Sequence, residues 1–563
     1  MDYFRSKKWI KEIEKTDLFF KQNNEKRNYY IETLPSHKNS CYVSKSIWDD
    51  IQHNKFIEQL HSNPHVQHFI NNVFSNPIYD KTLLEKRQDT LSYFYKNKSL
   101  PSILTLEISD KFDWLLNIEP TIKNYIMDVM FPKSWTFKWL YWDPLLLNSY
   151  HIYRAYWSPL TQCIYPISVI FGPYLYIYNK LQWKISFKNY IKTVYSTLLW
   201  IYKSSKDFTS QIRNIIVFGL YIGIYIYNFI QVMDWSHQIR KYRKTLLSSL
   251  KTVSDTITHF QTIINKIPID FWKPYLPNIE RSSLLKKIHF TTKHFQYYWK
   301  NPYTRTSIQN LYQILGIYEG LRSMSSLLSN DWTLCQYNDS NTIFGSMKHP
   351  EIKDAIANPI TLSKNLIITG PNAAGKTTYV KSLLWNLLFA QSLGIIRCKY
   401  GTTQLYEAIL HHDRIKDVIG EQSLFQAEMY KAKEVLQQCK NYHKLIYFMD
   451  EPFHSTPPLD GSAMLKAFMF YLANNTNSKM ILTTHYFTLQ DLEKTLPKRF
   501  KNICMEAILQ IDNSYQFPYK IKKGYSKQSI GIELLKINDF PEDLIQTALK
   551  MKNKIYSEKV NVP

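Results

Sequence analysis

Nine consecutive residues have the types and spacing of a phosphate-binding loop. They read Gly370-Pro371-Asn372-Ala373-Ala374-Gly375-Lys376-Thr377-Thr378 and fit the pattern G-x-x-x-x-G-K-[ST]. The glycines allow backbone amides to converge on phosphate oxygens, Lys376 can reach the β and γ phosphates, and the Thr377 hydroxyl can bind Mg²⁺. The β-branched run at 366–369 predicts a buried strand before the loop. A helix is expected from Thr378, and its N-terminal dipole favours bound phosphate.

Acidic and imidazole side chains follow two further apolar runs. Asp450 and Glu451 come directly after the run at 445–449, and His485 comes shortly after the run at 480–482. An Asp at the end of such a strand can bind Mg²⁺, and the adjacent Glu451 can polarise the water that attacks the γ-phosphate. His485 can sense that phosphate. The three sites together predict an ATPase that uses ATP and Mg²⁺, with Lys376, Glu451 and His485 as its catalytic residues.

A wider set of segments carries a family resemblance. The segments are GPNAAGKTTYVKS at 370–382, SLFQAEM at 423–429, Met449-Asp450-Glu451, THYF at 484–487 and GYSKQSIGIEL at 524–534. In type and order they resemble the motifs of the ATPase domain of the MutS family, the DNA mismatch-repair ATPases. The resemblance covers about residues 345–555.

The resemblance implies two ATPase domains that dimerise and share their sites. Gly370–Thr377, Asp450, Glu451 and His485 would then bind and cleave ATP in one subunit, and Ser423 would reach the γ-phosphate held by the other. Taken without the resemblance, Ser423 is better explained as a plain helix cap, but SLFQAEM in register favours the signature role. The chain departs from the family at two places: Phe453-His454-Ser455-Thr456 replaces a flexible GRGT, and Ala355 stands where an aromatic often packs against adenine.

The upstream half resembles the MutS core and lever more faintly, over 44–97 and 310–337. The expected fold is therefore α plus α/β, with helical core and lever regions followed by a P-loop ATPase domain of MutS type. The expected segments are an extension at 1–45, first lever helices at 46–144, an insert at 145–235, second lever helices at 236–344, and the ATPase with a C-terminal helical dimerisation segment at 345–563. The shortened layout, without a mismatch-reading or connector domain, resembles MutS-like proteins of large DNA viruses.

The insert at 145–235 contains two runs without charge, 155–179 and 214–233, each long enough to cross a bilayer. Between them Lys180, Lys184, Lys188 and Lys192 are spaced by four, which predicts four ammonium groups on one helix face. Three interpretations remain open. The insert is a buried variant of the lever and clamp whose lysines contact phosphate or water, a membrane hairpin, or a basic amphipathic helix on a membrane surface.

Two features weigh against a membrane hairpin. The segment 180–213 carries seven basic residues and one acidic residue, so placing it across the membrane from a cytosolic ATPase violates the positive-inside tendency. Pro159, Pro166 and Pro173 also weaken the first run as a helix.

The charge balance sets expectations for the partner and the compartment. The net charge is +24, which favours an anionic partner, although a lysine-rich coding bias also produces it. The six cysteines are scattered and form no C-x-x-C pair, which predicts neither a zinc site nor a disulfide scaffold and fits a reducing compartment. We expect an intracellular site of DNA replication or repair.

Two functions are consistent with these features. The first is a homodimeric MutS-like ATPase that binds double-stranded or branched DNA in mismatch repair or recombination. The second is a membrane-attached MutS-like ATPase, held through 155–179 and 214–233, whose partner is not naked DNA. A transporter ATPase is disfavoured because SLFQAEM stands in place of an LSGGQ-type signature.

Overall fold

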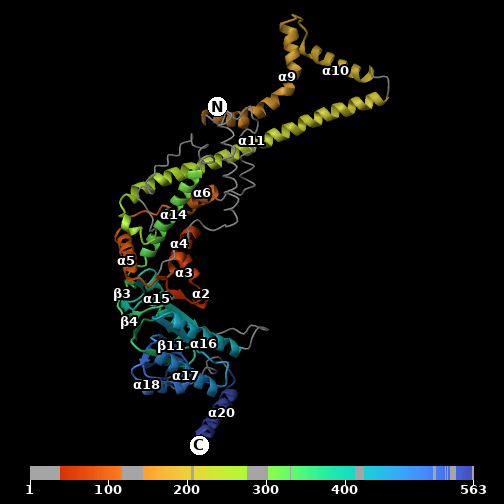
Figure 1. The fold of residues 1–563 in the computed structure, drawn as a ribbon. Helices are drawn as coiled ribbons and strands as arrows, with labels where there is room; N and C mark the ends of the chain where they lie inside the picture. The colour runs from red at the N-terminus through yellow and green to blue at the C-terminus, as the bar shows by residue number, and fades with distance from the viewer. Residues whose placement is uncertain are drawn as a thin grey trace. The chain divides into compact units, whose positions relative to one another are not determined.

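The computed structural model describes residues 39–116, 144–204, 208–275, 302–329, 331–412, 424–510, 515–526, 528, 531–532, 535 and 540–560. Within these residues the contacts divide the chain into two compact units (Figure 1). One unit contains 105–262, and the other contains 39–104 together with the chain from 313 onward. The five-segment division expected from the sequence stays a prediction.

A seven-stranded sheet organises the second unit. Its order is β1-β9-β10-β11-β6-β12-β15, and every neighbouring pair is parallel except β12 and β15. The strands are β1 (Tyr42–Val43), β6 (Asn365–Thr369), β9 (Ala408–His412), β10 (Leu445–Asp450), β11 (Lys479–Thr483), β12 (Phe500–Met505) and β15 (Ile521–Lys523). Every residue of β6 is buried, which is the usual state of a parallel strand covered on both faces. The expected combination of helical regions with an α/β domain is therefore confirmed.

Helices cover this sheet. They are α15 (Lys376–Ser392), α16 (Leu424–Asn441), α17 (Pro458–Asn475), η5 (Phe487–Gln490) and α18 (Asp491–Thr495), and a further helix, α20 (Glu542–Val560), follows later in the chain. Helix α15 is buried almost throughout, and its Trp385 stacks on Phe389 with ring centroids 5.5 Å apart. The helix begins at Lys376, two residues before the expected start at Thr378, because Gly375 takes the N-cap position with a left-handed φ of 92°.

Smaller sheets flank the main one. A four-stranded sheet has the order β3-β8-β4-β5, and two strand pairs join β2 to β7 and β13 to β14. The strands are β2 (Thr333–Leu334), β3 (Gln336–Tyr337), β4 (Thr342–Met347), β5 (Asn358–Leu362), β7 (Ile395–Ile396), β8 (Tyr400–Thr403), β13 (Ile508–Leu509) and β14 (Tyr515–Gln516). The loop between β4 and β5 matters for function because it forms one wall of the cavity described below.

The helical character implied by the resemblance over 44–97 is confirmed. It forms α2 (Lys45–Ile51), α3 (His53–Leu60), α4 (Pro64–Phe74) and α5 (Lys81–Lys96), and the later helices are η3 (Ile269–Phe271) and α14 (Pro302–Ser325). Phe56 and Ile57 lie inside α3 and are buried. The short strand β1 was not predicted, because two residues are too few to show a period.

The first unit contains α6 (Leu106–Leu116), α8 (Pro144–Ile152), η2 (Tyr153–Trp157), α9 (Ser158–Asn179), α10 (Phe187–Ser204) and α11 (Phe208–Ile264). Helix α9 continues through Pro166 and Pro173. It contains no buried residue, and none of the apolar window in α11 is buried. The interpretation of the insert as a buried segment is therefore wrong for α9 and for residues 215–233 of α11, because their contacts with neighbouring described elements leave these apolar stretches exposed. By length and composition both helices could cross a membrane.

The predicted lysine stripe is also wrong. Helix α9 ends at Asn179, and the chain then turns, with Gln182 at a φ of 54°, before α10 begins at Phe187. The turn lets Phe187 stack on Phe171, with ring centroids 4.6 Å apart. Lys180 and Lys184 therefore precede α10, and only Lys188 and Lys192 share a helix face.

Candidate functional site

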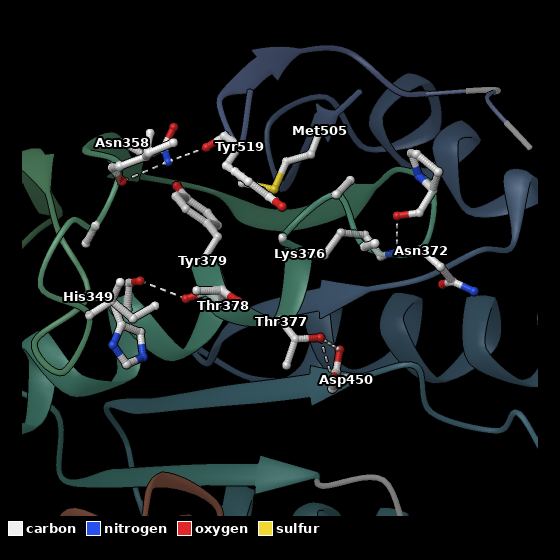
Figure 2. Close-up of a pocket in the computed structure, with 18 of the residues that line it drawn as sticks. His349, Asn358, Asn372, Lys376, Thr377, Thr378, Tyr379, Asp450, Met505 and Tyr519 are labelled. Atoms are coloured by element: carbon white, nitrogen blue, oxygen red, sulfur yellow. Dashed lines mark hydrogen bonds between the residues drawn. The ribbon is translucent and has the colours of Figure 1, made fainter. Parts of the chain in front are cut away.

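The predicted phosphate loop borders a cavity of about 760 Å³ in the second unit (Figure 2). The loop joins β6 to α15, while Asp450 ends β10 and His485 follows β11. Parallel strands place their carboxyl ends at one edge of a sheet, and ligands of α/β folds bind outside that edge. The structure therefore brings together the loop, Asp450, Glu451 and His485, which the sequence predicted to act jointly.

Two glycines permit the path of this loop. A Cβ on Gly370, where φ is 153°, would collide with the Met505 carbonyl oxygen. A Cβ on Gly375 would lie 2.9 Å from Tyr519 Cδ1, and its φ of 92° is one that other residues rarely adopt. Ala373 also has a positive φ, 64°. The loop is therefore held in a tight conformation that larger residues would disturb at its two glycines.

The Lys376 ammonium lies inside the loop. Its Nζ donates to the carbonyl oxygens of Gly370, at 2.9 Å, and Pro371, at 3.2 Å. Glu451 Oε1 is 3.8 Å from the same atom. Burial lowers the pKa of Lys376, and the nearby carboxylates of Glu451 and Asp450 oppose that shift. The His485 Nε2 atom is 3.5 Å from the ammonium. A buried cation that faces carbonyl groups, an imidazole and a partly exposed carboxylate is suited to receive an anionic ligand.

Thr377 and Asp450 meet on the cavity wall, as Figure 2 shows. The Thr377 hydroxyl donates to Asp450 Oδ2 at 3.0 Å. The Thr483 hydroxyl of the neighbouring strand donates to the other carboxylate oxygen. Oxygen donors of this kind are the ligands that Mg²⁺ prefers, so Thr377 and Asp450 fit the predicted metal site.

Glu451 and His485 form a close pair. His485 Nε2 lies 2.6 Å from Glu451 Oε1. Asp450 pairs with Thr483 across β10 and β11, which places the residues that follow these strands side by side. Glu451 has a left-handed φ of 46°, and its N–H donates to the Thr483 carbonyl oxygen at 3.1 Å. The backbone conformation of Glu451 and its contact with the His485 imidazole therefore orient the carboxylate.

The segment that departs from the family pattern contacts α16. His454 Nδ1 lies 2.9 Å from Oε1 of Glu428, whose side chain is buried, and the Ser455 hydroxyl donates to the other oxygen. Ser423 itself lies outside the described residues, immediately before α16. These contacts therefore join the segment after Asp450 and Glu451 to α16, the helix that follows Ser423.

Several cavity residues were not predicted from the sequence. His349, Met505 and Tyr519 line the cavity without having been predicted. Ala355 also lines it, as its position in the resemblance suggested. Tyr519 comes from the segment before β15 and is held there by its carbonyl oxygen, which accepts from Asn358 Nδ2 at 2.9 Å. It supplies an aromatic ring to a wall where Ala355 supplies none. No local pattern marks Tyr519, because it joins the cavity only through the tertiary fold.

Acid is expected to destabilise the fold through His349. Burial, with nearby Lys381 and Arg397, lowers the pKa of His349 from 6.5 to about 4. Between these values the unfolded chain binds the proton and the folded chain does not, so stability falls as pH falls from 6.5 to 4. One pKa unit corresponds to about 1.4 kcal/mol, so the loss approaches about 3 kcal/mol. Urea unfolding of His349→Gln across this range should show a shallower decline than the wild type, and parallel curves would contradict the assignment.

Comparison with known proteins identifies the domain that contains this site. Residues 366–556 match the model of MutS domain V. The chain is similar to proteins named DNA mismatch repair protein MutS. It is 28% identical to that of Oceanobacillus iheyensis over 43% of this chain and 29% of the relative. It is 30% identical to that of Clostridium tetani over 44% and 29%. It is 33% identical to that of Streptococcus gordonii over 32% and 21%.

The chain thus spans less than one third of the length of these relatives. The matched segment contains the loop, the acidic pair and His485, in the order that the sequence motifs indicated. Residues 366–556 of this chain, which contain the site, therefore match MutS domain V.

Proposed function

We propose that this protein is an ATP-dependent, DNA-binding ATPase of MutS type that acts in mismatch repair or recombination at an intracellular site of DNA replication or repair. The observation that carries the proposal is the convergence of the loop, Asp450, Glu451 and His485 on one cavity within a MutS domain V. The cavity combines a cation inside the loop with carboxylates at the strand ends, which suits a nucleotide triphosphate.

Each side chain has a role set by its position. The Lys376 ammonium would exchange the carbonyls of Gly370 and Pro371 for β and γ phosphate oxygens, aided by the dipole of α15. Thr377 and Asp450 would hold Mg²⁺, which supplies charge neutralisation for the phosphates. Glu451 would orient the attacking water and accept its proton as the bond to the leaving ADP oxygen breaks. His485, at 2.6 Å, would position Glu451 and contact the γ-phosphate.

The adenine-facing wall gives a testable prediction. Base-aromatic stacking contributes about 1–3 kcal/mol by alanine substitution, so Tyr519→Ala is expected to raise the KM for ATP by roughly 5–150-fold with a smaller change in kcat. Tyr519→Phe keeps the ring and should retain near wild-type KM. Steady-state kinetics of both variants decide the point. Equal KM values for the alanine and phenylalanine variants would exclude stacking on this ring.

A composite dimer site is the finer part of the proposal. Ser423 would reach the γ-phosphate bound by the partner subunit. A mixture of Lys376→Ala and Ser423→Ala subunits should then form one intact site per heterodimer and recover part of the ATPase activity that each variant lacks alone. Activity that stays absent in the mixture, although both variants dimerise, would contradict shared sites.

DNA as the partner is tested by ATPase activity against duplex, mismatched, forked and four-way DNA. Binding through the basic chain should weaken steeply with salt, because each neutralised phosphate releases counterions. Stimulation by one structure would name the substrate. Indifference to all of them would leave an ATPase without DNA dependence.

A membrane-attached ATPase whose partner is not naked DNA is the second candidate. One observation favours it: the apolar runs of α9 and α11 are exposed along their length. The same DNA panel separates the candidates, because this second protein would hydrolyse ATP without responding to any DNA structure.

A further inference from the structure

The first unit exposes two apolar helical stretches that an aqueous protein would cover. They are α9 and residues 215–233 of α11, and no residue in either apolar window is buried. Exposed side chains include Ile164, Ile167 and Val169 on α9, and Ile216, Leu220 and Ile224 on α11. Helices that are apolar on all sides belong to protein cores or to membranes, and these helices lie in no described core.

In water these stretches would also lack the usual sources of helix stability. Pro166 and Pro173 each remove a backbone hydrogen bond from α9. Gly219 and Gly223 in α11 have nothing within 4 Å of the position of an added side chain, so no packing offsets their low helix propensity. In hydrocarbon the backbone has no competing water, which enforces the helix and tolerates proline and glycine.

The length and ends of α9 match a bilayer. Its 22 residues extend about 33 Å at 1.5 Å per residue, close to the hydrocarbon thickness of about 30 Å. Exposed Trp157 precedes the helix, and exposed Tyr178 and Trp183 lie at its other end. Tryptophan and tyrosine concentrate at both membrane–water interfaces. The spacing of these rings is therefore the one that a membrane helix requires.

Arginine side chains next to the two apolar stretches carry charges that suit a lipid headgroup layer. The Arg154 guanidinium lies 4.8 Å from the ring centroid of Trp235, and that of Arg240 lies 5.7 Å from the ring centroid of Tyr156. The Tyr225 hydroxyl donates to the Gln162 carbonyl oxygen at 2.7 Å, and Ser236 donates to Ala155 at the same distance, so α9 and α11 pair here. The runs 155–179 and 214–233 themselves contain no charged side chain.

We propose that α9 and residues 215–233 of α11 form a helical hairpin embedded in a phospholipid bilayer. Duplex DNA is a poor occupant of this surface, because phosphate contact requires cations that the stretches lack. Lys180, the residue that follows α9, lies at the end of the helix, where its ammonium complements anionic headgroups. The inference rests on neither ATP hydrolysis nor DNA binding, so it stands or falls separately from the proposed function.

A spin label placed at mid-hairpin tests the proposal on the full chain. Cys163 is the exposed cysteine, and Cys439 is half-buried while the other four are buried. In a Cys163→Ser background, Val169→Cys puts the label at the middle of α9, where the native side chain is exposed. Leu106→Cys in α6 is the matched control, since Leu106 is also an exposed apolar residue of this unit. The Cys163→Ser protein alone measures labelling elsewhere.

The accessibility of the label in phosphatidylcholine vesicles, with and without phosphatidylglycerol, separates the occupants. A bilayer makes the label at position 169 accessible to oxygen and shields it from a water-soluble nickel chelate, because the hydrocarbon core excludes water, whereas the label at position 106 stays accessible to nickel. Access of nickel to position 169 in both vesicle types would overturn the proposal. Low access to both reagents would also overturn it, because it would show that protein, such as a second copy, covers the helix.

Flotation provides a second readout. A charge at mid-membrane is strongly disfavoured, so Ile167→Lys combined with Ile224→Lys should reduce the vesicle-bound fraction about tenfold, while Leu106→Lys should not. The far-ultraviolet circular dichroism spectrum, measured in parallel, shows that each variant is folded. Equal flotation of the wild type, the double lysine variant and Leu106→Lys would contradict insertion. Trypsin added outside sealed vesicles then reports on which side the basic segment 180–213 lies.

Discussion

Replacement of Glu451 by glutamine is expected to leave ATP binding near the wild-type value and to reduce turnover by about 10²–10⁴-fold, the usual contribution of a positioned general base. Glutamine keeps the shape of the side chain, but its amide cannot accept the proton of the attacking water. The residue is held 2.6 Å from His485 and 3.8 Å from the Lys376 ammonium, so an isosteric change should disturb its surroundings little.

Single-turnover hydrolysis together with equilibrium binding of ATP measures both quantities. Glu506→Gln is the matched control, because Glu506 pairs with Lys522 at 2.8 Å on strand β15 and does not line the cavity. That variant should turn over at the wild-type rate. A Glu451→Gln protein that hydrolyses ATP normally would show that another group activates the water.

Replacement of Lys376 by alanine is expected to weaken ATP binding by roughly 10–150-fold. Hydrogen bonds from a charged group contribute about 1.5–3 kcal/mol net, and the alanine variant loses those that the ammonium would give to phosphate. The effect differs from that of Glu451→Gln, because Lys376→Ala weakens ATP binding, whereas Glu451→Gln reduces only turnover. Fluorescence titration with a nucleotide analogue measures it directly.

A stability measurement distinguishes this loss from unfolding. Burial lowers the pKa of Lys376, so at pH 7 its charge costs folding free energy, and the cost disappears only as pH rises through the lowered pKa. Lys376→Ala should therefore unfold at an unchanged or higher temperature than the wild type without nucleotide. Lys364→Ala, which removes a surface contact to the Pro497 carbonyl, should keep wild-type affinity. A Lys376→Ala protein that binds ATP normally would remove the loop from the mechanism.

Local patterns were sufficient for much of the site. The glycine and lysine spacing of the loop, the acidic pair after β10 and the histidine after β11 each depend on a few neighbouring residues, and all of them border one cavity. The strands β6, β10 and β11 were predicted because parallel strands buried on both faces read as continuous apolar runs. The start of α15 was misplaced by two residues because the left-handed Gly375, rather than side-chain type, sets it.

The sequence by itself determined the phosphate loop, the catalytic candidates and the helical character of residues 44–100, because backbone preference and apolar periodicity act over short distances. Only the tertiary structure placed Tyr519 across the cavity from residues more than 130 positions earlier, since that approach depends on how β15 pairs with β12. The tertiary structure also showed that the four lysines do not share one helix, because the chain turns before α10 and packs Phe187 on Phe171. Whether an apolar helix is covered by protein depends on its neighbours, which is why the structure, and not composition, showed that α9 and residues 215–233 of α11 are exposed.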